Sequence, residues 1–325
     1  WGQYDKAIKY FEDGDIATSL NNIGGVYYAR GQYDNAIKNF EEALAIAEKL
    51  GQEDGISDCL NNIGLVYSSR GQYDKAIKYY EEALEIDKKL GQEGGVGVAI
   101  SLLNIGSVYD DWGQYDNALK YYEEALVTFK KLGREDAIAA CLNAIGMVYK
   151  SWGQYDKAIE YYEESLAIDK RLGSEAGIAG SLGSIGIVYY SWGQYDKAIE
   201  NFEKALAIDK KLGQEDSVAT RLNSIGMVYI SQGKYDKAIE NFEKALAAFK
   251  KLGQEGSVAT CRNNIGLVYH HWGKYDKAIE YFEEALAIDR RLGTEGSAAT
   301  SLNNIGMVYD DWGQYDNALK YYEEA

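Results

Sequence analysis

A four-residue marker, Gly-Gln/Lys-Tyr-Asp, recurs along the chain at a nearly constant interval. Its glycines are Gly2, Gly31, Gly71, Gly113, Gly153, Gly193, Gly233, Gly273 and Gly313. Successive copies lie 29, 40, 42, 40, 40, 40, 40 and 40 residues apart. The segment DDWGQYDNALKYYEEA occurs twice without change, at 110–125 and 310–325. A fixed period of this length predicts a solenoid of stacked, equivalent units, each in contact with its neighbours.

The unit over residues 217–253 shows what one repeat is expected to fold into. Helical spacing gives its first helix an inward face, made of Leu222, Ile225, Gly226 and Tyr229. After the turn at 233–235, a second helix has an inward stripe of Ala238, Phe242 and Ala245. Asp236 lies in the first turn of this helix and Lys250 in its last turn, which suits the helix dipole. Each repeat is therefore predicted to be a pair of antiparallel helices, ended by glycines such as Gly253 because the chain has no proline.

A glycine also recurs inside every first helix, where it costs about 1 kcal/mol relative to alanine. The positions are Gly24, Gly64, Gly106, Gly146, Gly186, Gly226, Gly266 and Gly306. We expect a close helix contact to be the reason, with Ala238 of the following helix pressed against Gly226. Glycines that hold a phosphate would lie in a loop before a helix, so that interpretation is excluded.

The pattern L-x2-I-G-x2-Y followed by A-x3-F, at 222–229 and 238–242, resembles the tetratricopeptide repeat. The 40-residue period, the LNNIG segment and the long second helix are similar to the kinesin-light-chain and Pins-type variants. The resemblance implies an all-α fold over 1–325, a right-handed superhelical solenoid of about eight antiparallel helix hairpins. The chain departs from the standard pattern: leucine replaces the first tryptophan, the closing proline is missing and about six residues are added to each unit.

Three features break the regularity. The first unit, 2–30, is 11 residues short, so we expect it to be incomplete, with residues missing near 12–15. The GGVGV segment at 94–98 adds two residues to one loop and predicts local flexibility there. The sequence also opens and closes on second-helix segments, 1–12 and 313–325, without the polar capping helix that solenoids usually carry. We expect either further repeats or ends that stack on something.

Composition limits the classes of partner. The net charge of −17 repels phosphate backbones and anionic lipids, so neither nucleic acid nor a membrane surface is expected to bind. A neutral or basic protein segment is favoured. No apolar run approaches the ~20 residues that span a bilayer. Cys59, Cys141 and Cys261 occupy one equivalent position, which predicts small packing residues in a reducing, cytoplasmic compartment.

Catalysis has little support in the sequence. The chain's two histidines, His270 and His271, are adjacent on a first helix and point ~100° apart, so they cannot bind one metal from the same face. No metal-ligand spacing accompanies them, and we predict no enzyme activity, metal or cofactor. We expect both side chains to be exposed; the alternative is a pH-sensitive contact of His271 with Asp310 or Asp311 of the next repeat.

The outward face of the first helices is the predicted groove. In the unit above it holds Thr220, Ser224, Met227 and Ser231, flanked by Asn223 and Ile230. Asparagines recur there although asparagine is a poor helix former; they are Asn21, Asn22, Asn61, Asn62, Asn104, Asn143, Asn223, Asn263, Asn264, Asn303 and Asn304. An amide both donates and accepts hydrogen bonds, so it can pair with any peptide backbone. The resemblance adds that such asparagines contact bound peptides in the related families. The alternative is that these amides only satisfy hydrogen bonds between repeats.

Two groove positions vary while the scaffold stays constant, and we expect them to set specificity. One successive set is Gly25, Leu65, Ser107, Met147, Ile187, Met227, Leu267 and Met307. The other is Tyr28, Ser68, Asp110, Lys150, Tyr190, Ile230, His270 and Asp310. Combined with the asparagines, the predicted partner-binding residues are Asn61, Asn62, Asn104, Asn143, Met147, Lys150, Tyr190, Asn223, Met227, Asn263, Asn264, His270, Asn303, Asn304, Met307 and Asp310.

The sequence thus predicts a protein-interaction scaffold that binds a partner peptide or protein segment in a concave groove. Two alternatives stay open. The first is a structural solenoid that self-associates through its uncapped ends into filaments or rings. The second is the sensor arm of a larger regulatory protein.

Overall fold

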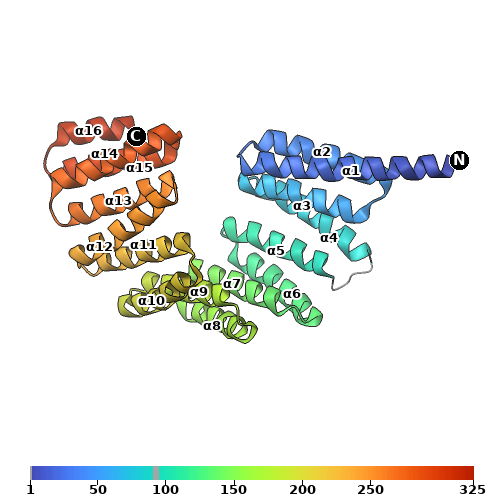
Figure 1. The fold of residues 1–325 in the computed structure, drawn as a ribbon, viewed down its shortest axis with the longest axis horizontal. Coiled ribbons are helices and arrows are strands. Elements are labelled where there is room, and N and C mark those ends of the chain that lie inside the picture. Colours follow the sequence, from blue (N-terminus) through green and yellow to red (C-terminus); the bar gives the residue numbers. More distant parts are fainter. Residues whose placement is uncertain (1, 91–94) are drawn as a thin grey trace. The chain divides into compact units, whose positions relative to one another are not determined.

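The computed structural model describes the backbone of residues 2–90 and 95–325, and the side chains of 15–90 and 95–325. Regular structure in these ranges is entirely helical (Figure 1). The helices are α1 (Gly2–Ala29), α2 (Tyr33–Leu50), α3 (Glu53–Ser69), α4 (Tyr73–Lys89), α5 (Val96–Asp111), α6 (Tyr115–Leu132), α7 (Glu135–Ser151), α8 (Tyr155–Leu172), α9 (Glu175–Ser191), α10 (Tyr195–Leu212), α11 (Glu215–Ser231), α12 (Tyr235–Lys251), α13 (Glu255–His271), α14 (Tyr275–Leu292), α15 (Glu295–Asp311) and α16 (Tyr315–Glu324). Odd-numbered helices are the first helices of the repeats, and even-numbered helices are the second helices.

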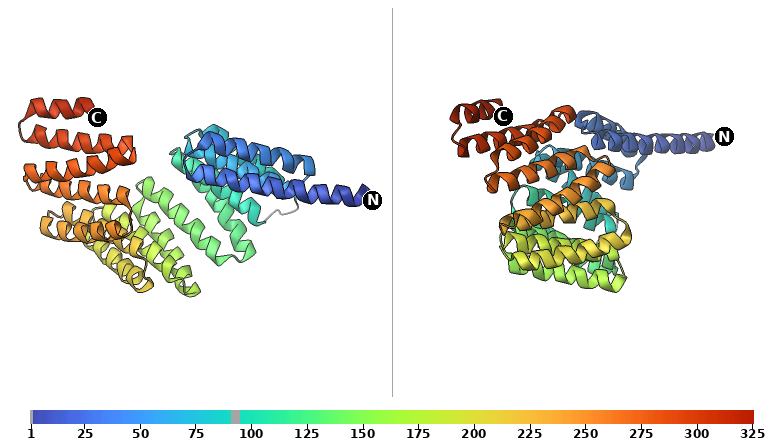
Figure 2. Two further views of the ribbon diagram at one scale, coloured as in Figure 1. Left: turned by 45° about the horizontal axis from the view of Figure 1, so that its top comes forward. Right: turned by 60° about the vertical axis from the view of Figure 1, so that its left-hand side comes forward.

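The chain divides into two units, Trp1–Ile168 and Asp169–Ala325, each a stack of helix hairpins. In the first unit α1 to α7 pack in sequence, each helix on the next, and in the second unit α9 to α16 do the same. Figure 2 shows these hairpins from two further directions. The predicted all-α solenoid of antiparallel hairpins is confirmed.

Glycine ends the helices, as expected for a chain without proline. Gly233 adopts a left-handed backbone with φ of 68°, and the next N–H, of Lys234, donates back to the carbonyl of Tyr229 at 2.9 Å. Gly213 at the opposite end of a hairpin has φ of 69°. Only glycine adopts this conformation without a steric penalty, and the bonds satisfy carbonyls that the helix end would leave unpaired.

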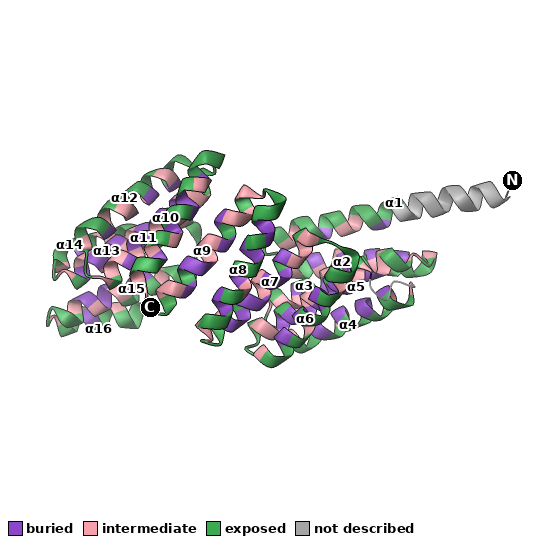
Figure 3. Cartoon of the chain, turned by 90° about the horizontal axis from the view of Figure 1, so that it is seen from below, coloured by how far each residue is buried: buried purple, intermediate pink, exposed green. Residues whose placement is uncertain are grey.

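The core follows the predicted inward faces. Leu222, Ile225 and Gly226 are buried and Tyr229 is half-buried, while Phe242 of the second helix is completely buried. Ala238 and Ala245 are buried as well. Figure 3 shows the buried positions as stripes along the helices, flanked by exposed ones. Phe242 lies in one buried cluster with Ile265 and Val268 of the next first helix, and Phe282 lies in another with Ile305 and Val308, so a cluster forms at each of these joints.

The recurrent glycine is required by an aromatic ring, and the predicted alanine partner is wrong. A Cβ built on Gly226 would lie 2.7 Å from Cε1 of Phe242, too close for any side chain. Gly186 faces Phe202 and Gly64 faces Tyr80 in the same way. The rotation of the two helices brings the longer A-x3-F side chain, rather than the alanine one turn before it, over the glycine.

The shortened first unit contains no turn. α1 is one continuous helix of 28 residues, so the expected end of a second helix near residue 12 is wrong. The intervening residues are too few to reverse the chain, and the helix continues instead. In the extra loop segment 94–98, residue 94 lies outside the described residues and α5 begins at Val96.

Buried aspartates of the second helices pair with the next first helix. They are Asp87, Asp169, Asp209 and Asp289, and their partners are Ser101 at 3.1 Å, Ser181 at 3.1 Å, Arg221 at 3.3 Å and Ser301 at 3.4 Å. Where the first helix carries a cysteine instead, the position of the aspartate is apolar; these are Ala47, Phe129 and Phe249, opposite Cys59, Cys141 and Cys261. Either both members of a pair are polar or neither is. The three cysteines are buried free thiols, as predicted for small packing residues.

Candidate functional site: the groove face of the first helices

The first helices of successive repeats lie against one another within each unit. α3 contacts α5, α11 contacts α13 and α13 contacts α15. Their outward strip, which we call the groove face, consists of residues equivalent to Thr220, Ser224, Met227 and Ser231. Thr220 and Ser231 are exposed, and Ser224 and Met227 are half-buried. The strip is therefore accessible along the first helices of each unit.

Amide side chains join neighbouring repeats beside this face. Nδ2 of one asparagine donates to Oδ1 of an asparagine in the preceding repeat, in the pairs Asn62–Asn21 at 2.9 Å, Asn104–Asn61 at 3.2 Å and Asn264–Asn223 at 2.9 Å. Asn263 instead exchanges bonds with the hydroxyl of Ser301, at 3.0 Å as donor. We call this set the amide ladder. Seven of the predicted asparagines thus take the inter-repeat role that the sequence left as the alternative, and Asn22, Asn143, Asn303 and Asn304 are not part of the ladder.

The ladder orients the amides without exhausting them. A carboxamide has two N–H donors and two acceptor lone pairs. Asn62, Asn104 and Asn264 each donate one ladder bond, whereas Asn61 accepts from Asn104 and Ser101 and donates to Ser57, so one N–H of Asn61 remains. Asn61, Asn62, Asn104 and Asn264 are half-buried, so part of each remains accessible. In α15, Asn304 is half-buried and Asn303 is exposed. Oδ1 of Asn143 is buried and accepts no hydrogen bond within the described residues.

The ladder is interrupted where residues in two repeats change together. Leu103 and Ala144 are both apolar and occupy the places of an asparagine pair.

A second interruption lies in α9, where Gly183 replaces the asparagine because the guanidinium of Arg221 fills the space. A Cβ on Gly183 would lie 2.0 Å from Nη1 of Arg221. Sequence reasoning missed this arginine. The signal was an arginine at a serine or cysteine position, combined with an asparagine-to-glycine change one repeat earlier.

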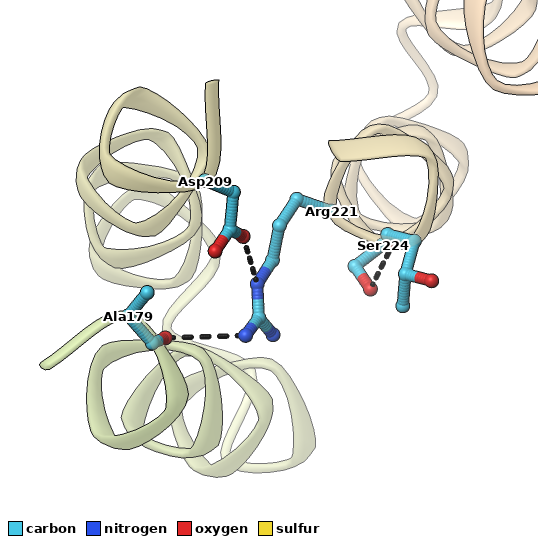
Figure 4. Close-up of polar contacts among 5 residues, drawn as sticks. Ala179, Asp209, Arg221 and Ser224 are labelled. Carbon is cyan, nitrogen blue, oxygen red and sulfur yellow. Dashed lines mark hydrogen bonds and ion pairs between the residues drawn. The ribbon is translucent and has the colours of Figure 1, made fainter. Parts of the chain in front are cut away.

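Arg221 ties three helices together (Figure 4). Its Nε donates to Oδ2 of Asp209 on α10 at 3.3 Å, and its Nη2 donates to the carbonyl oxygen of Ala179 on α9 at 3.1 Å. The Asp209 side chain is 2% exposed and that of Arg221 is 16% exposed. A charge this deeply buried is tolerated because it is paired and hydrogen-bonded.

One of the two histidines lies as predicted. His271 is exposed, whereas His270 is buried, and its Nε2 lies 2.8 Å from Oδ2 of Asp311 in the next repeat. The contact with an aspartate that the sequence offered as the alternative for His271 is made by His270 instead. Burial lowers the pKa of His271, with the neighbouring His270 adding to the effect and Asp311 opposing it. A helix residue and the one after it face different directions, and the stacking turns only the first of the two toward α15.

The contact of His270 repeats a link found elsewhere at the edge of the groove face. Tyr28 bonds to Ser69 at 2.9 Å, and Ser231 donates to the Tyr190 hydroxyl at 3.3 Å. Each link joins a variable-position residue to a residue about one repeat later. The second variable set therefore serves contacts between repeats as well as the surface.

In the second unit the first variable set forms an apolar strip on the groove face: Ile187 is 41% exposed, and Met227, Leu267 and Met307 are half-buried. In the first unit Met147 is 45% exposed, and Ser107 interrupts the apolar residues. Charged side chains lie beside the strip: Lys150 is half-buried and Asp310 is exposed. Burial raises the pKa of Asp110, with Asp111 adding to the effect and Lys150 opposing it.

The described residues contain no group of three or more histidine, cysteine or acidic side chains placed to hold a metal ion. Among the described residues, no helix is both long and apolar enough to cross a bilayer. The groove face offers amides, hydroxyls and apolar side chains, which are groups that bind and orient rather than react.

The sequence profile of the Tetratricopeptide repeat matches residues 15–89, 97–171, 153–211, 177–251, 216–291 and 257–325, and a second profile of that description matches 61–130. None of the curated proteins matches. Among solved structures, the quorum sensor NprR from B. thuringiensis in its apo form has a TM-score of 0.68 at 17% identity, covering 98% of this chain and 90% of that one. A Rap protein complexed with Competence and Sporulation Factor has a TM-score of 0.60 at 16% identity, covering 97% and 96%. Kinesin-light-chain TPR-like repeats from Podosopora anserina have a TM-score of 0.54 at 22% identity, covering 62% and 98%. At these identities the likeness concerns the fold.

Proposed function

Because the chain belongs to the tetratricopeptide repeat family, we propose that its groove face binds an extended segment of a partner protein or a free peptide. The observation that carries this proposal is the amide ladder next to the apolar strip. The ladder holds amides such as Asn264 in one orientation before any partner arrives, which lowers the entropy cost of binding. Binding by a prearranged surface is what a repeat scaffold supplies.

The solved relatives support a peptide as the partner. A Rap protein was solved with Competence and Sporulation Factor, and NprR is a quorum sensor. Both have a solenoid that superposes on nearly the whole of this chain. The same architecture is suited to a signalling peptide or to an unstructured segment of a larger protein.

The chemistry of the groove face indicates what such a segment contains. Amide groups of the ladder bind the peptide backbone, and the spacing of the hairpins, ~10 Å or more, matches three or more extended residues. Ile187, Met227 and Met307 bind apolar side chains at that interval. Asp310 and the chain's charge of −17 favour a partner with basic residues toward α15.

The test begins with selection of peptides of about 15 residues from a display library on the immobilised 325-residue chain. Affinities are then measured by fluorescence anisotropy. We expect Ile187→Glu to weaken the selected peptides about tenfold or more, because it puts a charge in an apolar subsite. Asn223, Asn263 and Asn303 replaced together by alanine are expected to weaken them as well. Leu252→Glu, at an exposed leucine away from the groove face, is the matched control and should change affinity less than twofold.

Two results would contradict the proposal. One is equal loss of affinity in Ile187→Glu and Leu252→Glu, which would place the peptide elsewhere. The other is full affinity both in the triple asparagine variant and in the separate Ile187→Glu variant. Circular dichroism of each variant separates a lost contact from a lost fold, since the asparagines also join repeats.

A further inference from the structure

Exposed tryptophans lie where two first helices of the first unit end, at the turn to the second helix. Trp112 is 40% exposed and Trp152 is 39% exposed, although each packs at a joint between a second helix and the next first helix. The ring centre of Trp112 lies 5.8 Å from that of Tyr73, and that of Trp152 lies 5.9 Å from Tyr115. Tyr109 stacks on Trp112 as well, at 6.4 Å. Each tryptophan is therefore fixed by a neighbouring tyrosine while part of its ring meets solvent.

A pocket of about 450 Å³ opens at the first of these joints. Its lining residues are Gly71, Gln72, Tyr73, Asp74, Lys75 and Trp112. Asp74 is exposed, and in the described part of the chain its carboxylate forms no hydrogen bond or ion pair. Burial raises the pKa of Tyr109, and Glu81 and Asp74 add to the effect, so two carboxylates face the rings. Nζ of Lys75 lies 5.1 Å from the ring centre of Tyr67, in its own hairpin.

The next joint repeats the arrangement. Asp116 is exposed. Burial raises the pKa of Tyr149, and Glu123 and Asp116 add to the effect. Nζ of Lys157 lies 4.9 Å from the ring centre of Tyr149, again within one hairpin. Both joints thus present an exposed tryptophan with a tyrosine and an aspartate. We call these sets the turn-edge sites; they are Tyr73, Asp74 and Trp112, and Tyr115, Asp116 and Trp152.

Cations of the chain itself occupy equivalent places at other joints. Between α2 and α3 an arginine, Arg70, takes the place of the tryptophan. It forms an ion pair with Asp34, and its Cζ lies 5.6 Å from the ring centre of Tyr33. In the second unit, Nζ of Lys274 lies 3.2 Å from the ring centre of Trp272. These contacts show that the tyrosine and aspartate of such a joint bind a guanidinium, and that its tryptophan binds a cation.

We propose that the turn-edge sites bind arginine side chains of a basic, extended protein segment. The ring of Trp112 and the carboxylate of Asp74 hold one guanidinium, and Trp152 and Asp116 hold the next. A guanidinium suits these groups because it is planar, so it stacks on a ring while its N–H groups donate to a carboxylate. Neighbouring hairpins lie ~10 Å or more apart, so the arginines are three or more extended residues apart.

This binding goes beyond the proposed function, because it uses a different surface and a different kind of side chain. One exposed cation site of this sort binds weakly. Two sites on adjacent hairpins reinforce each other when one segment reaches both. The segment recognised is therefore one with several arginines at regular intervals rather than one with a single arginine.

The test measures binding of a labelled peptide with an arginine at about every fourth residue, by fluorescence anisotropy on the 325-residue chain. The same peptide with lysines in place of the arginines should bind several times more weakly. In the variant Trp112→Gln/Trp152→Gln, affinity for the arginine peptide should fall about fivefold or more. The chain itself carries Gln232 at this place in another repeat, so the variant keeps the net charge and should keep the fold, as circular dichroism will show.

A pair of charge-matched variants separates the turn-edge sites from general attraction to an acidic protein. Asp74→Asn/Asp116→Asn should weaken the arginine peptide about threefold more than Glu48→Gln/Glu85→Gln does. Both variants remove two exposed carboxylates, but Glu48 and Glu85 lie toward the other ends of their helices. A parent chain that does not bind the peptide, equal affinity in the tryptophan variant, equal losses in the two carboxylate variants, or equal affinity for the lysine peptide would each overturn the proposal.

The outcome is distinguishable from that of the groove experiment. Ile187→Glu should bind the arginine peptide as the parent chain does, because Ile187 lies on the groove face. Trp112→Gln/Trp152→Gln should bind the peptides selected for the groove face with unchanged affinity. Each surface thus has a variant that leaves the other surface intact, and either proposal can fail alone.

Discussion

At the residue scale, the determining contact is an aromatic ring against a glycine. Eight first helices carry this glycine, and in the unit of α11 and α12 the ring of Phe242 leaves no space for a Cβ on Gly226. The glycine costs helix stability locally, but it lets the two helices approach closely enough to bury the ring completely. Local propensity and packing oppose each other here, and packing prevails.

Gly226→Ala should therefore destabilise the protein although alanine is the better helix former. Overpacking against a rigid ring costs about 1–3 kcal/mol. Gly256→Ala is the matched control, because Gly256 lies in α13 and a Cβ added there would meet no neighbouring side chain within 4 Å. That change should be neutral or stabilising by up to about 1 kcal/mol. Urea unfolding followed by circular dichroism measures both; equal midpoints for the two variants would refute the packing explanation.

At the scale of helices, the polar and apolar pairs decide how one hairpin joins the next. Asp209 and Arg221 are a charged version of the pair that Phe249 and Cys261 make with apolar side chains. Both pairs occur at equivalent places between a second helix and the next first helix. This contact can therefore be polar or apolar, provided that both residues of the pair are of the same kind. A buried charge without its partner is the state that the sequence avoids.

Arg221→Ala should cost about 3–5 kcal/mol, because it leaves the carboxylate of Asp209 buried and unpaired. The double variant Asp209→Phe/Arg221→Cys copies the apolar pair and should recover most of that loss. A double-mutant cycle in urea measures the coupling between the two positions. Additive effects of the two single changes would show that the pair does not act as a unit.

At the scale of the whole molecule, stability is the sum of similar hairpins and the joints between them, so opening is expected to be local and greatest near the ends. The three cysteines report on this because each lies in a different first helix: Cys59 in α3, Cys141 in α7 and Cys261 in α13. Burial raises the pKa of the Cys59 thiol to about 11 and those of Cys141 and Cys261 to about 12. The native thiols thus carry almost no reactive thiolate at pH 8.

A disulfide reagent at pH 8 should accordingly label the native protein slowly and the urea-unfolded protein at once. Labelling then requires opening of the hairpin that holds each thiol, and Cys141, in the middle of the sequence, should be the slowest of the three. Mass spectrometry of digested samples over time gives the three rates separately. Equal rates would indicate that the whole array opens in one step.

Much of the fold was predictable because its signals are local. The period, the two helices of each hairpin, their inward faces and their glycine ends all depend on residues within one turn or one unit of each other. The first unit was the exception: its shortness was recognised from the sequence, but the continuation of the segment 1–12 into one helix, α1, was not. The inter-repeat role of the asparagines was foreseen as an alternative, whereas Arg221 and the pairing of His270 with Asp311 were not.

The amino-acid sequence alone determined that this chain is a stack of near-identical helix hairpins, and where each hairpin begins, turns and ends. Only the tertiary structure decided which side chains meet across the stack: which ring covers the glycine, which amide bonds to which, and which histidine reaches an aspartate 41 residues away. The physical reason is that these contacts depend on the rotation and offset between packed helices. A helical pattern fixes the face on which a side chain lies, but not the neighbour that the face will meet.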